Sequence, residues 1–204
     1  MTITIIIIAI TVVVSFLAFN SYVLLNRLIL WPPAVKRDHE YWRLVTYGLV
    51  HADGQHLLFN MITLYFFGQI MERIYVNDIG VVGYVLFYVG ALVASILPTY
   101  AKNENNPDYR SLGASGAVSA VLFAFILVNP WAMIGVLFFP MPAILYAVLY
   151  IGYSIYMDRR GRGNINHSAH LWGAAYGVAF TLVMEPYRFS AFINAVGHPS
   201  TGRF

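Results

Sequence analysis

The sequence predicts an all-α membrane protein, built as a single domain over residues 1–204 with six transmembrane helices. Of its residues, 59% are hydrophobic and 10% are charged, and the mean hydropathy is +0.66. A soluble domain carries about a quarter charged residues. Runs without Asp, Glu, Lys or Arg also reach the roughly 20 residues that cross a bilayer. We expect helices at approximately 3–26, 54–73, 79–101, 113–129, 132–157 and 165–184.

Charged segments separate the first three predicted helices. The run 3–26 is rich in Ile and Val and lacks the basic start and small-residue cleavage site of a signal peptide, so we expect it to be retained. A charged segment separates it from the second helix, whose uncharged stretch, Gly54 to Met71, is short for a span. The third helix, 79–101, ends at a polar loop. We expect the tail from Glu185 to be short, polar and exposed to solvent.

Proline divides the second half of the chain. The run from Ser111 to Met157 has no charged side chain and is long enough for two helices. Pro130 marks the break between them, because proline disfavours helix at the preceding residue. Pro140 and Pro142 are expected to distort the fifth helix. We find no internal repeat and no segment outside the helices large enough to fold alone.

The composition excludes several kinds of site. The sequence has no cysteine, so a disulfide framework and a thiolate metal site are both excluded. The net charge of +3 comes from residues scattered through loops, with no basic patch for nucleic acid. There is no HExxH pattern and no obvious carboxylate ligand near the histidines. We therefore expect no metal and no other cofactor.

Strongly polar side chains inside the predicted helices lie in three places. His56 and Asn60 begin the second helix, four residues apart on one face. Ser115 begins the fourth helix, and His170 begins the sixth. Polar groups are costly in a membrane and often mark a function. Helices two, four and six cross in the same direction, so all four side chains can meet roughly 6–8 Å below the preceding loop.

Small residues favour close contact between the fourth and sixth helices. Gly173 and Gly177 form a small-xxx-small pair, and Gly113 and Gly116 flank Ser115 in a run of small residues. Close backbones would bring the serine within hydrogen-bond reach of the histidine. A serine hydroxyl becomes a good nucleophile when an adjacent base takes its proton.

Each polar residue also has an ordinary structural interpretation. Ser115 alone is more often a packing residue, and its GxSG string lacks the spacing of a GxSxG nucleophile elbow. His56 and Asn60 form an interhelical hydrogen-bonding pair as readily as a catalytic one, and His170 can cap a helix. We expect two further histidines in solvent and two neighbours of His170 to point away from the site: His39, His198, Asn166 and His167.

Taken together and in order, these residues resemble the rhomboid family of intramembrane serine proteases. The resemblance runs from about Trp42 to Gly177. It is carried by Trp42-Arg43 in the first loop, His56 to Asn60, Gly113 to Gly116, and Ala169 to Gly173. It implies a six-transmembrane-helix rhomboid bundle that works as an integral, multi-pass protein of a membrane such as the bacterial inner membrane.

The resemblance also implies roles for the polar residues. Ser115 would attack the substrate carbonyl and His170 would remove its proton, as a dyad without a carboxylate. His56 and Asn60 would line an oxyanion hole, with backbone N–H groups near Ser115. The partners implied are the lipid bilayer and transmembrane-protein substrates, cut where a helix is locally unstable and a residue is small. A stable helix hides its peptide bonds in its own hydrogen bonds.

One position departs from the family pattern. Many members carry an aromatic residue one turn after the serine, where it packs on the catalytic histidine. Here that position is Ser119. Another residue must then orient His170, and Trp172 and Tyr176 are the candidates in the sequence.

The charge distribution conflicts with the orientation that the family implies. The resemblance places the active site on the extracytoplasmic side. The positive-inside rule counts Lys and Arg near helix ends and favours the opposite. Three lie on the far side (Arg73, Arg188 and Arg203), whereas nine lie on the side of the site: Arg27, Lys36, Arg37, Arg43, Lys102, Arg110, Arg159, Arg160 and Arg162.

Two other functions compete with the protease. One is a catalytically inactive rhomboid-like protein that binds membrane clients, although such proteins lack the serine or the histidine and this chain keeps both. The other is a small transporter or channel, which we expect to carry a buried carboxylate or an inverted repeat. Neither occurs in the uncharged runs of the predicted helices. The natural substrate, the oligomeric state and any regulator stay open.

Overall fold

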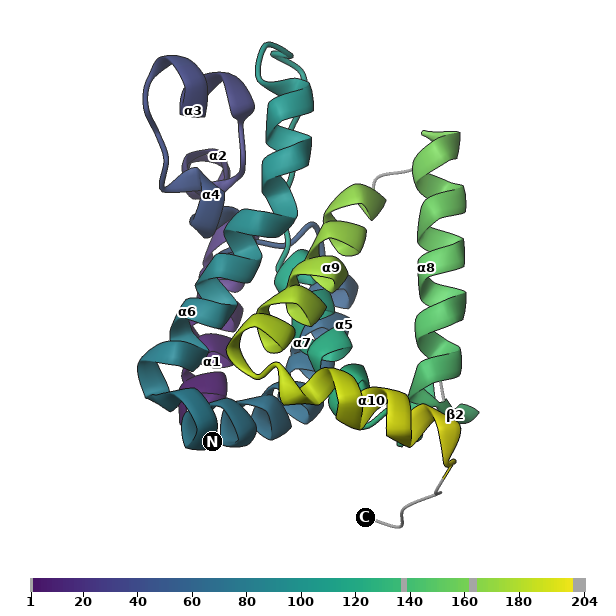
Figure 1. The fold of residues 1–204 in the computed structure, drawn as a ribbon. Helices are drawn as coiled ribbons and strands as arrows, with labels where there is room; N and C mark the ends of the chain where they lie inside the picture. The colour runs from purple at the N-terminus through teal and green to yellow at the C-terminus, as the bar shows by residue number, and fades with distance from the viewer. Residues whose placement is uncertain (1, 137–138, 162–164, 200–204) are drawn as a thin grey trace.

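The computed structural model describes residues 2–136, 139–161 and 165–199, so Arg162 and Arg203 of the charge count lie outside it. The described chain is almost entirely helical (Figure 1). Its elements in order are α1 (Thr2–Phe19), α2 (Tyr22–Leu28), α3 (Pro32–Arg37), α4 (Arg43–Thr46), η1 (Tyr47–Leu49), α5 (Gly54–Thr63), the π-helical turn η2 (Leu64–Gly68), α6 (Gln69–Asn103), α7 (Ser115–Val128), β1 (Met133–Val136), β2 (Phe139–Pro142), α8 (Ala143–Arg160), α9 (His167–Met184) and α10 (Tyr187–Gly197).

The first predicted helix, 3–26, is divided in the structure. α1 ends at Phe19, and Ser21 starts α2 by accepting a hydrogen bond from the backbone N–H of Leu24 at 3.2 Å. Serine is a strong N-cap because its hydroxyl satisfies a free donor of the first turn. The short helices α2 to α4 then form a lobe beside the upper end of α6 (Figure 1). Inside this lobe the buried Arg43 donates to the carbonyls of Asn26 and Ile29.

The junction between the second and third predicted helices differs from the prediction. The structure has no loop between 73 and 79, because the helix continues from α5 through η2 into α6. The change of direction falls at Gly80, whose φ of +79° suits glycine alone among ordinary residues. Before this kink, Glu72 accepts hydrogen bonds from the N–H groups of Ile3 and Thr4 at 3.1 and 2.9 Å. The carboxylate thus caps the start of α1.

α7 is the centre of the molecule. Its residues from Gly116 to Leu127 are all buried, and its neighbours include α5, α6 and α9. The contact with α9 is close enough to exclude a side chain. A Cβ on Gly173 would lie 2.0 Å from the carbonyl oxygen of Gly116, and one on Gly177 would lie 2.1 Å from that of Ala120. Such approach is what small residues allow between membrane helices.

The prediction of a fifth helix over 132–157 is wrong before Ala143, where α8 begins. Met133–Val136 and Phe139–Pro142 instead pair as antiparallel strands. Pro140 and Pro142 therefore lie in β2 and do not distort the helix. Proline lacks a backbone N–H, so it interrupts a helix but is tolerated in an edge strand.

The tail after Glu185 contains a further helix, α10, which the sequence analysis did not predict; the expected exposure of this segment agrees with the absence of any buried residue in α10. α10 lies across the base of the bundle (Figure 1). The indole N–H of Trp131 donates to the carbonyl of Ala195 at 2.9 Å, and Arg188 pairs with Asp78 at 3.1 Å. These contacts fasten α10 to the end of the bundle opposite the α2–α4 lobe.

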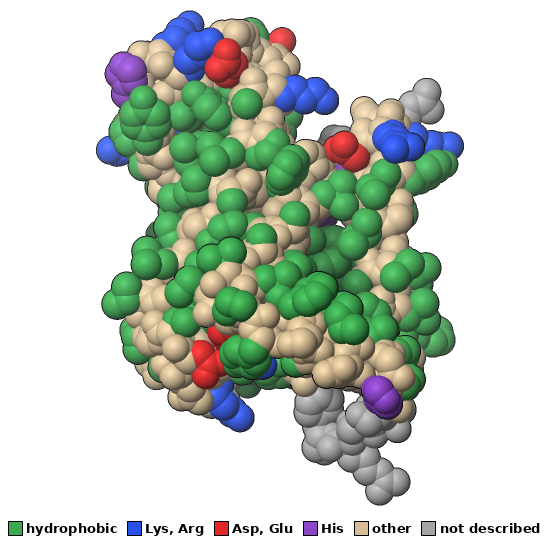
Figure 2. All heavy atoms as spheres, in the orientation of Figure 1, with side chains coloured by type: hydrophobic (Ala, Val, Ile, Leu, Met, Phe, Trp, Pro, Cys, Tyr) green, Lys and Arg blue, Asp and Glu red, His purple; other side chains and the backbone are tan. Residues whose placement is uncertain are grey.

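The surface of the bundle suits a lipid environment. Within the described residues, Thr2–Phe19 and Gly54–Asn103 are two helical stretches long and apolar enough to cross a membrane. Charged side chains gather at the two ends of the face in Figure 2, and hydrophobic side chains cover most of the band between. Leu86, Val148 and Val183 are among the large apolar residues in contact with the surroundings, at 61%, 63% and 75% exposure. An apolar band of this kind marks an interaction surface.

Candidate active site

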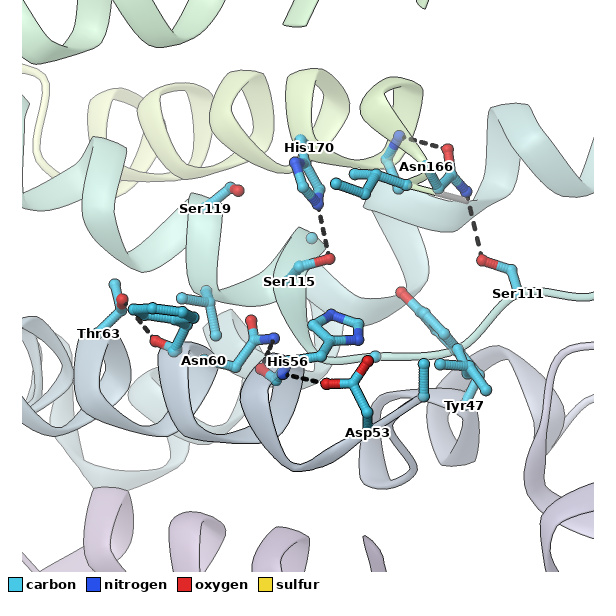
Figure 3. A pocket seen from close by; sticks show the side chains of 18 of the residues that line it. Tyr47, Asp53, His56, Asn60, Thr63, Ser111, Ser115, Ser119, Asn166 and His170 are labelled. Carbon is cyan, nitrogen blue, oxygen red and sulfur yellow. Dashed lines mark hydrogen bonds between the residues drawn. The ribbon is translucent and has the colours of Figure 1, made fainter. Parts of the chain in front are cut away.

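A cavity of about 890 Å³ lies between α5, α7, α8, α9 and the loop that precedes α7. Ser115, His170, His56 and Asn60 all line it. In Figure 3, the two residues of α5 lie on one side of the cavity, Ser115 lies between, and His170 lies on the other side. The structure therefore brings together the four polar residues that the sequence singled out.

Ser115 and His170 are joined by a hydrogen bond. The hydroxyl Oγ of Ser115 lies 2.8 Å from Nε2 of His170 (Figure 3). Ser115 is the first residue of α7, and His170 lies in the first turn of α9. The glycine contacts between these helices fix the distance between their first turns. The arrangement can transfer the serine proton to the imidazole when Nε2 carries the lone pair.

The start of α7 supplies hydrogen-bond donors to the cavity. The first N–H groups of a helix have no carbonyl partner within that helix, and the helix dipole is positive at this end. Gly113 leads the chain into α7 with a φ of +108°, and a Cβ there would meet the ring of His56 at 2.6 Å. A glycine at this position thus lets His56 approach the backbone beside Ser115.

His56 and Asn60 reach the cavity from one face of α5. Asp53 caps α5 by accepting from the N–H of His56 at 2.7 Å. The amide Nδ2 of Asn60 donates to the carbonyl oxygen of His56 at 2.9 Å. Because this amide has two N–H groups, the second is free for another acceptor.

The aromatic ring beside His170 comes from α8. The ring of Tyr150 lies 6.1 Å from that of His170, centroid to centroid, at an interplanar angle of 16°. The hydroxyl of Ser119 lies 2.6 Å from the phenolic oxygen of Tyr150. The two candidates from the sequence are wrong: Trp172 is 52% exposed, and Tyr176 stacks on Phe87.

His51 is a buried site residue that the sequence analysis missed. Its ring is 2% exposed, and Nε2 accepts from the N–H of Ala114 at 3.3 Å. Its Nδ1 lies 3.0 Å from the hydroxyl of Ser15, which itself donates to the carbonyl of Leu49. The ring also meets that of His56 edge to face at 5.0 Å. His51 therefore ties α1 and the loop before Ser115 together; its signal was a histidine five residues before His56, within a charged segment taken as a loop.

Asn166 lines the cavity, contrary to the prediction that it points away, whereas His167 is not among the lining residues. The side chain of Asn166 caps α9 by accepting from the N–H of Ala169 at 3.0 Å. It also donates to Tyr109 and Ser111 in the loop before α7. The ring of His167 meets that of His170 edge to face at 5.7 Å. The hydrogen bonds of Asn166 thus hold the start of α9 against that loop.

Outside the membrane-facing band, the α2–α4 lobe is bound to the end of α6. Lys36 pairs with Glu104 at 2.7 Å, and its ammonium holds the pKa of that carboxyl below its usual value. The guanidinium of Arg110 lies 4.5 Å from the centre of the Trp31 ring, and Trp31 donates to the carbonyl of Pro107. These contacts anchor the loop that leads to Ser115.

A comparison with protein families matches residues 38–187 to the model of the rhomboid domain. The chain belongs to the rhomboid family. The match covers α4 to α9 and the cavity-lining residues of that segment. It does not cover α1, α2 or α3. Members of the family are integral membrane proteins, which accords with the apolar band of Figure 2.

Individual rhomboid proteins are similar over most of this chain. The RHOMBOID-like protein 12, mitochondrial, of Arabidopsis thaliana is 32% identical over 80% of this chain. The protein YdcA of Bacillus subtilis is 31% identical over 73% of it, and the rhomboid protease GlpG of Haemophilus influenzae is 26% identical over 78%. The chain spans 52% of the length of the plant relative, 71% of YdcA and 77% of GlpG.

The side chain of His170 contacts residues of α7, α8 and α9. Within the described residues, no Asp or Glu side chain hydrogen-bonds to His170, and no group of three His, Asp or Glu side chains is suited to hold a metal ion. The contacts of His170 are instead a serine, a histidine edge and a tyrosine face.

Proposed function

We propose that this rhomboid is an intramembrane serine endopeptidase, with Ser115 as nucleophile and His170 as general base. The observation that carries the proposal is the 2.8 Å hydrogen bond between Ser115 and His170 at the floor of a cavity lined by further donors. A nucleophile and base within 2.6–3.2 Å are the signature of an activated serine.

The reaction begins when Nε2 of His170 takes the hydroxyl proton of Ser115. The freed Oγ attacks the carbonyl carbon of the scissile peptide and forms a tetrahedral intermediate. Its oxyanion is stabilised by N–H groups at the start of α7 and by the side chains of His56 and Asn60. His170 then gives the proton to the leaving amine. A water molecule attacks the acyl-enzyme in the same way, which releases the second product and restores Ser115.

The substrates in this proposal are transmembrane segments of other membrane proteins. The six crossings of a single domain over residues 1–204 would be α1, the helix from α5 through η2 to Gly80, the rest of α6, α7, α8 and α9. A segment that unwinds locally and offers a small residue would fit a site enclosed by helices, since a stable helix protects its own peptide bonds. The two bacterial relatives support a bacterial cell membrane as the location.

The proposal is tested by labelling the purified full chain with a fluorophosphonate probe, which reacts with activated serines. We expect the wild type to be labelled, and Ser115→Ala and His170→Ala to lose labelling, because the two residues act as a unit. Ser190→Ala removes an exposed serine of α10 and is the matched control, with labelling unchanged. Cleavage of a transmembrane reporter in liposomes should follow the same pattern.

An unlabelled wild type that is folded and monodisperse would overturn the proposal. Binding of membrane clients, as in inactive rhomboid-like proteins, would then be the function to test. Labelling that persists in Ser115→Ala would show that another serine reacts.

A further inference from the structure

We propose that Tyr150 positions the general base, and that Ser119 holds Tyr150 in place from the helix of the nucleophile. The inference rests on the proposed function and deepens it. It assigns to α8 the control of the alignment between Ser115 and His170. Tyr150 is a positioning residue in this scheme, since it acts on the reaction through His170.

The first observation is the stack itself. The rings of Tyr150 and His170 are nearly parallel, at 16°, with centroids 6.1 Å apart. This falls in the range of offset-stacked aromatic pairs, which contribute about 0.5–1.5 kcal/mol beyond the area that they bury. The face of the imidazole is thereby covered, while its edge stays free to meet Ser115.

The second observation is the hydroxyl contact that fixes Tyr150. Ser119 lies one turn after Ser115 on α7 and is 4% exposed. Its hydroxyl lies 2.6 Å from that of Tyr150, and the rings of Phe123 and Tyr146 pack on Tyr150 at 5.5 and 5.6 Å. The helix that carries the nucleophile therefore also sets the position of the ring that orients the base.

The third observation is the small number of other constraints on the imidazole. Across the described chain, Ser115 is the only hydrogen-bond partner that we find for the side chain of His170. The terminal torsion of a histidine is broad, so a single hydrogen bond leaves the ring free to rotate about it. The stack, together with the edge contact from His167, restricts that rotation.

The fourth observation is the peripheral position of α8. Its buried residues, in the described part, are Ala143, Ala147 and Ser154, and it stands at the edge of the bundle in Figure 1. Segments with few buried contacts open at lower free energy than the core. An outward displacement of α8 withdraws Tyr150 from both Ser119 and His170. The dyad then loses its alignment while the bundle stays folded.

The test measures the labelling rate of the full chain with a small fluorophosphonate. We expect Tyr150→Leu to lower the rate about tenfold to hundredfold, because a misplaced catalytic group costs up to about 10²-fold. Tyr150→Phe keeps the ring and should lose about threefold, the effect of one neutral hydrogen bond. Ser119→Ala should match it, and the double variant should lose no more than either, since both remove the same bond.

Tyr156→Leu is the control on the same helix, at an exposed position whose ring contacts Arg160. Its labelling rate should equal that of the wild type. A Tyr150→Leu variant labelled as fast as the wild type would overturn the inference while leaving the protease intact. A Tyr150→Leu variant that is labelled at the wild-type rate but cleaves a transmembrane substrate slowly would also overturn the inference, because Tyr150 would then be a substrate contact.

A second readout does not depend on activity. The ring of Tyr150 shifts the NMR signals of the His170 imidazole protons, which are assigned by their absence in His170→Ala. We expect these signals to move in Tyr150→Leu and to stay in place in Tyr150→Phe. Signals unaffected by Tyr150→Leu overturn the inference even if no serine is labelled, so its failure is distinct from failure of the proposed function.

Discussion

α8 and α9 have the same length, 18 residues, but are held in the molecule in different ways. α9 lies against α7 with Gly173 and Gly177 pressed on backbone carbonyls. α8 carries Gly152, where an added Cβ would meet nothing within 4 Å. His170 thus lies on the helix that is packed closely against α7, and Tyr150, whose ring stacks on it, lies on α8. We therefore expect changes on α9 to keep Ser115 and His170 apart, and changes on α8 to alter only how the two side chains are aligned.

The largest effect is expected from a change at the close contact between α7 and α9. In Gly173→Ala the new methyl group would overlap the carbonyl of Gly116, so the two helices must separate. We expect a loss of about 3 kcal/mol or more of stability and no fluorophosphonate labelling. Gly152→Ala is the matched change on α8 and should be neutral or stabilising by up to about 1 kcal/mol. Thermal unfolding in detergent measures both, and equal melting temperatures would contradict the comparison.

A smaller effect is expected from a change at His51, which contacts the loop before Ser115. His51→Leu leaves the N–H of Ala114 and the hydroxyl of Ser15 without their buried partner. A buried donor left unsatisfied costs about 1–3 kcal/mol. We expect a lower melting temperature and slower labelling, because the loop before Ser115 loses its anchor. His51→Gln, which keeps an acceptor, should recover part of both; no recovery would assign the effect to packing alone.

The smallest effect sharpens the assignment of the oxyanion donors. Asn60→Ala removes one side-chain donor and leaves those of His56 and the start of α7. We expect labelling to slow about tenfold, below the 10²–10³ typical of a single essential donor. The melting temperature should change little. A complete loss of labelling together with a lower melting temperature would indicate that Asn60 maintains the structure of α5.

The sequence predicted the polar residues that line the cavity better than the residues that hold them in position. Polar groups are rare in apolar helices, and this drew attention to Ser115, His170, His56 and Asn60. The second, fourth and sixth helices cross in the same direction, which placed the starts of these helices on one side of the membrane. Their catalytic roles stay predictions. Tyr150 was not found, because an aromatic residue in an apolar helix carries no signal and its contact with His170 depends on how α8 packs. His51 was missed because a charged segment was taken as a loop.

The boundaries of the helices show the same limit. The uncharged run from Ser111 to Met157 read as two helices, since hydropathy does not distinguish an apolar strand from an apolar helix. The two strands Met133–Val136 and Phe139–Pro142 depend on pairing between separate segments of the chain. Gly80 likewise bends a helix that a charged stretch had suggested was broken earlier.

The short length of α7 has a consequence for how this protein fits a bilayer. Its 14 residues rise about 21 Å, less than the roughly 30 Å of a hydrocarbon core. A helix facing lipid would pay for that hydrophobic mismatch by tilting or by thinning the membrane. α7 avoids it because its neighbours enclose it, and they meet the lipid in its place. The depth of Ser115 is then set by where this helix starts inside the bundle, and it should change little between membranes of different thickness.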